Sequence, residues 1–378
     1  MAGYSTRCNQ CGGTGWTGPT ACSSGWTCTA SDPHYSQCVP GGNEEFSGAQ
    51  PTPGFATKTG YFFVHFYDRQ PAIFAHLSND NNPLSYKTLN GDRAILVPTS
   101  GTKAVRDPHL VSAPDDSRHF IIGTDLDIVA INNDWDRATR QGSRSIHIWE
   151  STDLVNWGNY RLVNVMGATA GMVWAPEAVW DPDRGAYLVH WASRTYAASD
   201  SGVSGHWPPI IALILMSLFS FQHTGTASRD QIWYAHTNDF RTFTAAQIYI
   251  AASVPVIDLT ILPLGGSSYA RFIKDENVNR IYQENSNNGL FGTWTRVGNV
   301  IANVGTEGPL VFQDNQTPST VRVFVDAYNS QKQYIPFHTT NITSGSWIAD
   351  SGLPPLLKHG VVKPVTQAQY NAIQSKWP

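Results

Sequence analysis

One pattern, repeated five times, constrains the fold of this chain more than any other feature. Each copy consists of an apolar strand, a turn made of Ser, Thr, Asn and Asp residues, and an aromatic residue shortly after the turn. The clearest copies run over residues 73–86, 146–157 and 232–243, and weaker copies run over residues 281–294 and 334–347. The aromatic residues that end the copies are Tyr86, Trp157, Phe243, Trp294 and Trp347, at intervals of 71, 86, 51 and 53 residues.

Further strand signals fill the intervals between the copies, for example at residues 61–66 and 321–325. Sheets repeated in this way along a chain are the signature of a β-propeller. A β-sandwich is the alternative, but it would not repeat one turn five times. The sequence therefore predicts an all-β fold with a five-bladed propeller over residues 60–378. If residues 61–90 supply strands to the last blade, the two ends of the domain pair to close the ring.

The composition excludes several classes of function. Only 14% of the 378 residues are charged and the formal net charge is −4, so the chain has no electrostatic footprint for a nucleic acid. Hydrophobic residues make up 41% of the chain, which excludes low-complexity disorder. We expect a soluble monomer with no nucleic-acid partner and no membrane partner.

The cysteines are confined to one end of the chain. All five lie in the first 38 residues, at Cys8, Cys11, Cys22, Cys28 and Cys38. A stretch this short cannot bury enough apolar surface to fold alone, so disulfides would have to hold it together. Zinc is the alternative, but Cys8-x-x-Cys11 lacks a second close pair. Disulfides imply an oxidising destination, so we expect a secreted, extracellular protein whose signal peptide is absent from this sequence.

The residues around these cysteines form a specific pattern. Cys11-Gly-Gly-Thr-Gly-Trp16-Thr-Gly-Pro, the Cys22-x5-Cys28 spacing and Tyr35-Ser-Gln-Cys38 resemble the fungal family 1 carbohydrate-binding module over residues 4–39. The resemblance implies the disulfides Cys11–Cys28 and Cys22–Cys38. It also implies a flat strip of aromatic side chains that stacks on the sugar rings of cellulose.

The implied cellulose-binding strip departs from the family pattern. Its residues here would be His34, Tyr35 and Gln37, but the first aromatic position holds Cys8 and the second holds His34. We therefore expect weak binding to cellulose. Residues 40–59 contain Gly41-Gly42 and Pro51-Thr-Pro53-Gly54 and read as a linker to the propeller.

Four acidic residues lie next to small residues or proline, just before apolar strands, between the repeated turns. They are found in Asp107-Pro-His-Leu-Val, Trp-Ala-Pro-Glu177-Ala-Val, Val-Ile-Asp258-Leu-Thr and Glu307-Gly-Pro-Leu-Val. Any one of them could be an ordinary turn carboxylate. One acid per blade at the start of the innermost strand would instead converge on one pocket. Glycoside hydrolysis requires converging carboxylates, because one donates a proton while another activates water or attacks the sugar.

This order of motifs resembles glycoside hydrolase family 43 over residues 60–370, and most of all its arabinofuranosidase-like branches. Residues 149–157 and 271–276 carry further signatures of the family. The resemblance implies that Asp107 is the general base, that Glu307 is the general acid, and that Asp258 orients the acid and keeps it protonated. It implies release of L-arabinofuranose from arabinan or arabinoxylan with inversion. A β-xylosidase and a propeller that binds carbohydrate without cleaving it are the alternatives.

Four further residues are candidates for binding the substrate. Trp174 could stack on a sugar or pack in the core, and Glu177 would line the channel. Arg271 could bind a sugar hydroxyl or form a salt bridge with Asp275 or Glu276. His359 resembles a channel histidine that helps hold a metal ion, such as calcium, in some members of the family. A buried, hydrogen-bonded histidine is the alternative, and we expect no cofactor to be required.

Residues 203–222 do not fit the repeat. They include an apolar stretch, residues 210–221, which at 12 residues is shorter than the roughly 20 that a membrane helix needs. We interpret the segment as a retained intron, because its ends can be encoded by splice-like sequences and its removal brings the longest interval close to the others. A membrane-touching loop and a hydrophobic lid are the alternatives. Sequencing of the spliced transcript distinguishes these readings.

Overall fold

The chain folds as two separate units. A computed structural model describes residues 10–12, 14–18, 20, 26–32, 35–40, 57–197, 226–328 and 333–378. The two compact units are residues 1–55 and residues 56–378. The segment 203–222 and most of the stretch 40–59 lie outside the described residues, and the first strand of the second unit begins at Lys58. No helix in the described ranges is long and apolar enough to cross a membrane.

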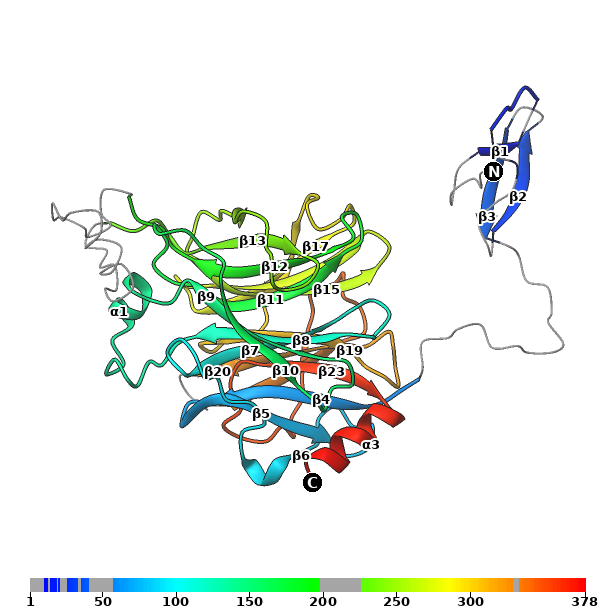
Figure 1. Cartoon of the computed structure of the whole chain (residues 1–378). Helices are drawn as coiled ribbons and strands as arrows, with labels where there is room; N and C mark the ends of the chain where they lie inside the picture. Colours follow the sequence, from blue (N-terminus) through cyan, green and yellow to red (C-terminus); the bar gives the residue numbers. More distant parts are fainter. Residues whose placement is uncertain are drawn as a thin grey trace. The chain divides into compact units, whose positions relative to one another are not determined.

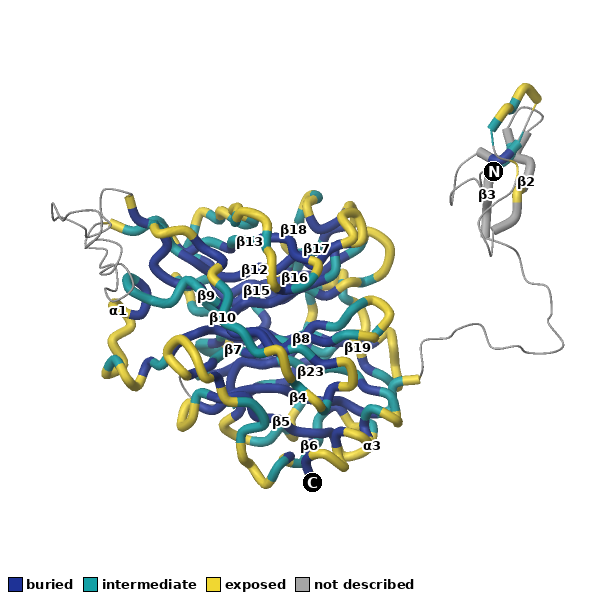
Figure 2. Tube along the Cα trace, in the orientation of Figure 1, coloured by how far each residue is buried: buried dark blue, intermediate teal, exposed yellow. Residues whose placement is uncertain are grey.

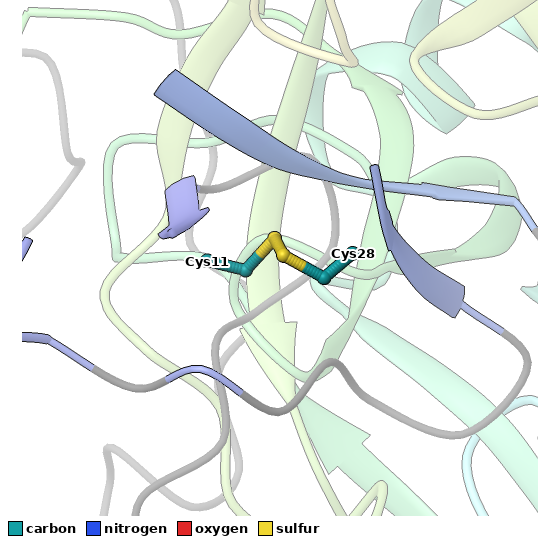
Figure 3. Close-up of a disulfide and its surroundings, with 2 residues drawn as sticks. All are labelled: Cys11 and Cys28. Carbon is teal, nitrogen blue, oxygen red and sulfur yellow. A yellow bond between two sulfur atoms is a disulfide. The ribbon is translucent and has the colours of Figure 1, made fainter. Parts of the chain in front are cut away.

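The first unit contains a small antiparallel sheet held by a disulfide. Its strands are β1 (Gln10–Gly12), β2 (Trp26–Asp32) and β3 (Tyr35–Pro40), in the order β1-β3-β2. The disulfide joins Cys11 to Cys28, with 5.9 Å between the Cα atoms (Figure 3). This pair was predicted and is confirmed. The predicted pair Cys22–Cys38 and the side chains of His34, Tyr35 and Gln37 lie outside the described part of this unit.

The strands of the second unit form five antiparallel sheets of four strands each, which are the blades of a propeller (Figure 1). The first blade is β7 (Val105–Ser112), β8 (His119–Asp125), β9 (Ser145–Ser151) and β10 (Gly158–Asn164). The second is β11 (Trp174–Asp181), β12 (Ala186–Ser193), β13 (Gln231–Thr237) and β14 (Gln247–Ile250). The third is β15 (Val256–Gly265), β16 (Ser268–Asp275), β17 (Arg280–Ser286) and β18 (Thr295–Val300). The fourth is β19 (Glu307–Gln313), β20 (Val321–Ala327), β21 (Gln333–Thr339) and β22 (Ile348–Ala349).

The fifth blade joins the two ends of the propeller. It is made of β23 (Val361–Thr366), β4 (Lys58–Tyr67), β5 (Gln70–Ser78) and β6 (Tyr86–Thr88), with β23 paired antiparallel to β4. The short helices are η1 (Asn90–Asp92), α1 (Trp135–Arg140) and the C-terminal α3 (Gln367–Lys376). The predicted five-bladed propeller, and its closure by strands from both ends, are therefore confirmed.

The first strand of each blade lies at the centre of the ring. β7 contacts β11, β11 contacts β15, β15 contacts β19, β19 contacts β23, and β23 contacts β7. Apolar clusters fill the spaces between neighbouring blades, as around Phe120 and Val189 between the first and second blades. Figure 2 shows the buried residues concentrated along these sheets. The innermost strands therefore line the central channel, and blade-to-blade packing fixes their positions.

The repeated turn of the sequence ends the third strand of every blade. The last residue of each third strand carries a hydroxyl group, at Ser78, Ser151, Thr237, Ser286 and Thr339. This hydroxyl accepts a hydrogen bond from the backbone N–H three residues later in two blades, at Leu154 (3.0 Å) and Phe240 (2.9 Å). The aromatic residue of each copy then packs into an apolar cluster between blades or on their edges. The motif therefore ends the third strand of each blade, and its aromatic residue packs the segment that follows against an apolar cluster.

A polar clasp reinforces the closure of the ring. Asp116, in the turn between β7 and β8, accepts hydrogen bonds from Lys363 Nζ (2.8 Å), Gln369 Nε2 (2.9 Å) and Lys58 Nζ (3.2 Å). These donors come from β23, α3 and β4, so one carboxylate ties the first blade to both ends of the domain. Partial burial alone would raise the pKa of Asp116, but Lys363, Gln369 and Lys58 outweigh it and hold the pKa well below its usual value.

We expect Asp116→Asn to destabilise the propeller at neutral pH. A charge-assisted clasp of this exposure stabilises by about 1–2 kcal/mol after screening by solvent. The folded-state pKa is depressed, so this contribution is present above the unfolded-state pKa of about 4 and declines as the pH falls below it. Urea unfolding of both proteins at pH 7 and pH 3 measures the difference. Equal stability at pH 7, or an undiminished gap at pH 3, would contradict the clasp.

Candidate active site

The four candidate carboxylates lie on an irregularity that recurs in the innermost strands. In β7, β11, β15 and β19, two residues lie opposite a single residue of the second strand, which is a one-residue β-bulge. The first residue inside each bulge adopts a left-handed backbone, with φ between 45° and 52°. These bulge residues are Asp107, Ala175, Asp258 and Gly308. The bulges re-aim the side chains around them, because they interrupt the alternation of the strand.

The carboxylates occupy three different positions relative to the bulges. Asp107 and Asp258 are bulge residues, Glu307 precedes the bulge residue of its strand, and Glu177 follows Ala175 by two positions. Each acid thus lies near the start of the innermost strand of its blade, as the sequence predicted, but the four positions are not equivalent. The sequence pattern shows an acid near each strand start, but the side chain of each position leaves the strand in a different direction.

The position before each bulge residue faces a pocket of about 480 Å³ at one mouth of the channel, which we call the mouth pocket. Its floor contains this position from four blades, namely Arg106, Trp174, Ile257 and Glu307. Its walls come from the connections between the second and third strands of all five blades, with Asp68, Trp135, Arg194, Glu276 and Tyr328 as one residue from each. Glu307 is thus the only one of the four candidate carboxylates that lines this pocket.

The ring of His359 connects the remaining candidates. Its Nδ1 lies 3.6 Å from an oxygen of Asp107, and its Nε2 lies 3.6 Å from an oxygen of Glu177. Burial alone would lower the pKa of His359, but Glu177, Asp258 and Asp107 outweigh burial and raise this pKa to about 9. The structure therefore brings these three carboxylates together around one imidazolium ion.

Hydrogen bonds link neighbouring bulges across the blades. Thr124 Oγ1 donates to Asp107 (2.9 Å) and accepts from the backbone N–H of Ala175 (2.8 Å). Asp258 accepts from the backbone N–H of Gly308 (2.9 Å). A Cβ atom on Gly308 would lie 2.7 Å from the ring of His359, so this position requires glycine. The Asp258 carboxylate thus holds the backbone next to Glu307.

Two buried lysines compensate the negative charge around Glu307. Lys274 Nζ lies 3.2 Å from Glu307 and 2.7 Å from Glu276, and its side chain is only 4% exposed. Burial would lower the pKa of Lys274, but Glu307, Asp258 and Glu276 outweigh it and raise this pKa. Burial also raises the pKa of Glu276. The carboxyl group of Glu307 thus shares one ammonium group with a second acid.

A second ion pair lies beside Glu307 in its own blade. Asp326 on β20 is the cross-strand partner of Glu307 and forms an ion pair with Lys358 at 2.8 Å. Asp326 is fully buried, and its burial raises its pKa to about 7. The ammonium group of Lys358 lines the mouth pocket. Neutral pH therefore lies within the titration range of a carboxyl group next to the candidate acid.

Glu177 lies in the channel with histidines around it. His109 Nδ1 is 3.3 Å from one carboxylate oxygen of Glu177, and His359 contacts the other. Burial alone would raise the pKa of Glu177, but these two histidines outweigh it and lower the pKa. Glu177 is 4% exposed and is not among the residues that line the mouth pocket. Glu177 is therefore a buried channel residue that contacts the ring of His359.

The two other predicted substrate-binding residues have different surroundings. Trp174 lines the mouth pocket and contacts Trp135 edge to face, with 5.9 Å between the ring centroids. Arg271 forms its salt bridge with Glu284, not with Asp275 or Glu276 as the sequence suggested, and its guanidinium lies 4.2 Å from the centroid of Trp294. Strand geometry explains this correction, because Asp275 lies four residues, or about 13 Å, along β16 from Arg271, whereas Glu284 is the direct cross-strand neighbour of Arg271 on β17.

No group of three His, Cys, Asp or Glu side chains is arranged to hold a metal ion within the part of the chain that the structure describes. Both ring nitrogens of His359 face carboxylates, and its raised pKa favours a cationic ring. A cationic imidazolium cannot ligate a metal ion, because both of its nitrogens carry protons. The charge of this ring is therefore linked to the carboxylates of Asp107 and Glu177.

Several residues of the site escaped the sequence analysis. Lys274 and Glu276 lie inside the family signature at 271–276, so the signature could have identified them. Thr124, Lys358 and Asp326 carry no local signal, because their contacts come from pairing between strands and between blades. Trp135 lies in a connection that the strand pattern left unassigned.

We expect Lys274→Met to shift the high-pH limb of the activity profile. Without the ammonium group, Glu307 lies beside Glu276 and Asp258 with no cation at 3.2 Å, which disfavours its ionised form. An acid that must be protonated would then stay active to higher pH. Lys274→Arg keeps the charge and is the control. If the high-pH limb of the activity profile, measured on the same substrate over pH 4–9, is the same in Lys274→Met and the parent, Lys274 does not influence the acid.

Comparisons with known proteins agree with this division of the chain. A family model related to glycoside hydrolase family 43, described as "Probable glycosyl hydrolase domain", matches residues 57–371. A second model, described as "Fungal cellulose binding domain", matches residues 9–35.

Among individual proteins, the chain is similar to an α-L-arabinofuranosidase of Bifidobacterium longum subsp. longum, at 32% identity over 230 residues. The match covers 58% of this chain and 20% of that protein. Its N-terminal part is similar to endo-1,4-β-xylanase C of Phanerodontia chrysosporium, at 58% identity over 41 residues, which cover 11% of this chain and 10% of the xylanase. The chain thus spans only a fifth and a tenth of these two relatives.

One solved structure similar to this chain is that of a thermostable family-43 glycoside hydrolase. The two share 14% sequence identity with a TM-score of 0.44, and the match covers 67% of this chain and 73% of the other.

Proposed function

Because the chain belongs to the family of probable glycosyl hydrolase domains related to glycoside hydrolase family 43, we propose that it hydrolyses plant cell-wall polysaccharide and releases L-arabinofuranose from arabinan or arabinoxylan. The observation that carries the proposal is the position of Glu307. It lies on the floor of the mouth pocket, 28% exposed, with Asp258 fixing the backbone behind it.

In this proposal Glu307 is the general acid. Its carboxyl group donates a proton to the oxygen of the leaving group while the bond from that oxygen to the anomeric carbon breaks. The electron pair of the broken bond stays on the protonated oxygen. Lys274 orients the carboxyl group at 3.2 Å and stabilises the carboxylate that remains after proton transfer.

Asp107 is the proposed general base. It takes a proton from a water molecule whose oxygen attacks the anomeric carbon from the side opposite the leaving group. A base must be ionised, and His359 is a cation 3.6 Å from one oxygen of Asp107, while Thr124 donates to the other. Inversion requires the base and the acid to be separated by about 6.5–9.5 Å, so that the water fits between them.

Asp258 is proposed to position the acid. It reaches Glu307 through the backbone, because its carboxylate accepts from the N–H of Gly308. Its charge also acts on Lys274 and His359, whose pKa values it helps to raise. Asp258 therefore connects the acid side and the base side of the site without contacting the substrate.

The N-terminal unit is proposed to attach the enzyme to cellulose, and the whole protein to act outside the cell. The Cys11–Cys28 disulfide and the match to the fungal cellulose binding domain support both ideas. Because Cys8 and His34 replace two aromatic residues of the family strip, we propose that this attachment is weak.

We expect Glu307→Gln to lower kcat on arabinan by roughly 10²–10⁴-fold, because glutamine has no proton to give to the leaving oxygen. Asp68→Asn alters a carboxylate on the wall of the same pocket, where 62% of its side chain is exposed, and is the matched control. We expect this control to stay within about threefold of the parent, since a wall charge contributes only to binding. Near-parental activity of Glu307→Gln would remove this residue from the acid role.

The stereochemistry of the product tests the role of Asp107. We expect the sugar first released to have the anomeric configuration opposite to that of the bond cleaved, as followed by proton NMR in the first minutes of reaction. Asp107→Asn should slow this release roughly 10²–10⁴-fold, and azide should not restore a product of retained configuration. Retention, or a sugar covalently trapped on the protein, would overturn the inverting assignment.

A β-xylosidase remains the second candidate, because arabinofuranose and xylose present similar hydroxyl groups to a pocket. Hydrolysis of p-nitrophenyl α-L-arabinofuranoside and β-D-xyloside, side by side and each with the Glu307→Gln control, separates the two. If neither p-nitrophenyl glycoside nor arabinan is hydrolysed, the result would favour a propeller that binds carbohydrate without cleaving it.

A further inference from the structure

One wall of the mouth pocket presents an exposed aromatic ring. Trp135 is 48% exposed, whereas most large aromatic side chains of the described propeller are buried or half-buried. It lines the mouth pocket together with Trp174 and Ile257, which lie on the floor. Charged residues also line the pocket, among them Glu307 and Lys274. The pocket therefore combines an exposed aromatic face with charged groups.

The ring of Trp135 is held in place by two neighbours. Trp174 contacts it edge to face, with an angle of 84° between the ring planes. The guanidinium of Arg106 lies 5.8 Å from its centroid and also stacks on Phe66 at 4.5 Å. Arg106 is itself paired with Asp68 at 3.3 Å. The orientation of the indole is thus set before any ligand arrives, which lowers the entropy cost of binding.

The backbone that carries Trp135 is an ordered insertion. The connection between β8 and β9 runs over residues 126–144, whereas the corresponding connections at 68–69 and 276–279 are short turns. Asp134 caps the first turn of α1 by accepting from the N–H of Arg137. Leu126, Ile128 and Ala138 form a small apolar cluster that packs against Trp174. A long connection with its own core presents one tryptophan to the pocket.

The position of Trp135 on the wall of the pocket indicates which part of a substrate it contacts. The floor holds Glu307, whose proton must reach the oxygen between two sugars. In the proposed reaction, the sugar that is released lies on the floor side of that oxygen, toward Asp107 on the innermost strand β7, and the leaving-group sugar extends toward the walls, which the connections form. A sugar ring has flat apolar C–H faces, which stack on indole, and hydroxyl groups on its rim, which fit charged neighbours such as Arg106.

We propose that Trp135 is a stacking platform for the leaving-group sugar, a residue of the polysaccharide main chain next to the bond that is cleaved. This inference rests on the proposed function, since it takes Glu307 as the acid. It makes the site selective for an arabinose unit attached to a sugar chain, over one attached to a small alcohol. The enzyme would thus recognise the branch point as well as the branch.

The test compares substrates with and without a sugar on the leaving side. Trp135→Ala should raise KM about tenfold on arabinose-substituted xylo-oligosaccharides and on α-1,5-linked arabino-oligosaccharides, which corresponds to about 1.4 kcal/mol. It should leave kcat/KM on methyl α-L-arabinofuranoside unchanged, because this substrate has no ring to stack. Trp135→Phe keeps an aromatic face and should restore most of the affinity.

A matched control exists at the other end of the propeller. Phe291 is 47% exposed and lines a cavity with Asp181, the last residue of β11, whose first residue is Trp174. At about 3.3 Å per residue, this cavity lies roughly 23 Å from the floor of the mouth pocket. Phe291→Ala should therefore leave KM unchanged on every substrate. An unchanged KM of Trp135→Ala on the oligosaccharides, or an equal loss on the methyl glycoside, would overturn the platform.

A binding measurement separates this inference from the proposed function. Calorimetric titration of the full chain carrying Glu307→Gln with the same oligosaccharides measures affinity without turnover. Loss of affinity on adding Trp135→Ala supports the platform even if the parent protein cleaves none of these bonds. Equal affinity with and without Trp135 refutes the platform even if Glu307-dependent hydrolysis is found.

Discussion

The site depends on the one-residue bulge that recurs in four innermost strands. A left-handed backbone costs an L-residue roughly 1–2 kcal/mol, so the bulges need compensation from their surroundings. Hydrogen bonds join Thr124 to Asp107 in its own blade and to Ala175 in the next blade, and they join Asp258 to Gly308 in the next blade. The first blade therefore bonds to the bulge of the second, and the third blade to the bulge of the fourth. Because the blades share their apolar clusters, the ring as a whole holds the carboxylates in place.

The same arrangement explains how so many acids coexist in a small volume. Asp258, Glu276, Glu307 and Asp326 lie near only two lysines, and the balance is unfavourable unless some carboxyl group keeps its proton. The raised pKa values of Glu276 and Asp326 show where burial favours the neutral form. His359, whose ring lies against Gly308, carries positive charge between Asp107 and Glu177.

The sequence predicted the repeated blades of the propeller and the Cys11–Cys28 disulfide. Five copies of one turn predicted five blades, because the hydroxyl residue that ends each third strand, such as Ser151 or Thr237, is a local signal. The Cys11–Cys28 pair followed from a family resemblance. The position of each acid within its bulge was not predictable, since a bulge is defined by the register with a second strand. The partner of Arg271 was wrong for the same reason: Glu284 is its neighbour only across β16 and β17.

The floor of the mouth pocket is formed by strands and its walls by connections, so the two are restricted by different structural constraints. The floor is set by Arg106, Trp174, Ile257 and Glu307, and all four depend on bulges that blade packing holds rigid. The walls come from connections that no strand register restricts, and surface connections accept changes of length far more readily than strands do. A change of polysaccharide can therefore be achieved at the walls while the acids stay in place. The connection at 126–144 is long, has its own apolar cluster and carries the exposed side chain of Trp135. Under the proposal, this connection would determine selectivity for the sugar chain around the bond that is cleaved.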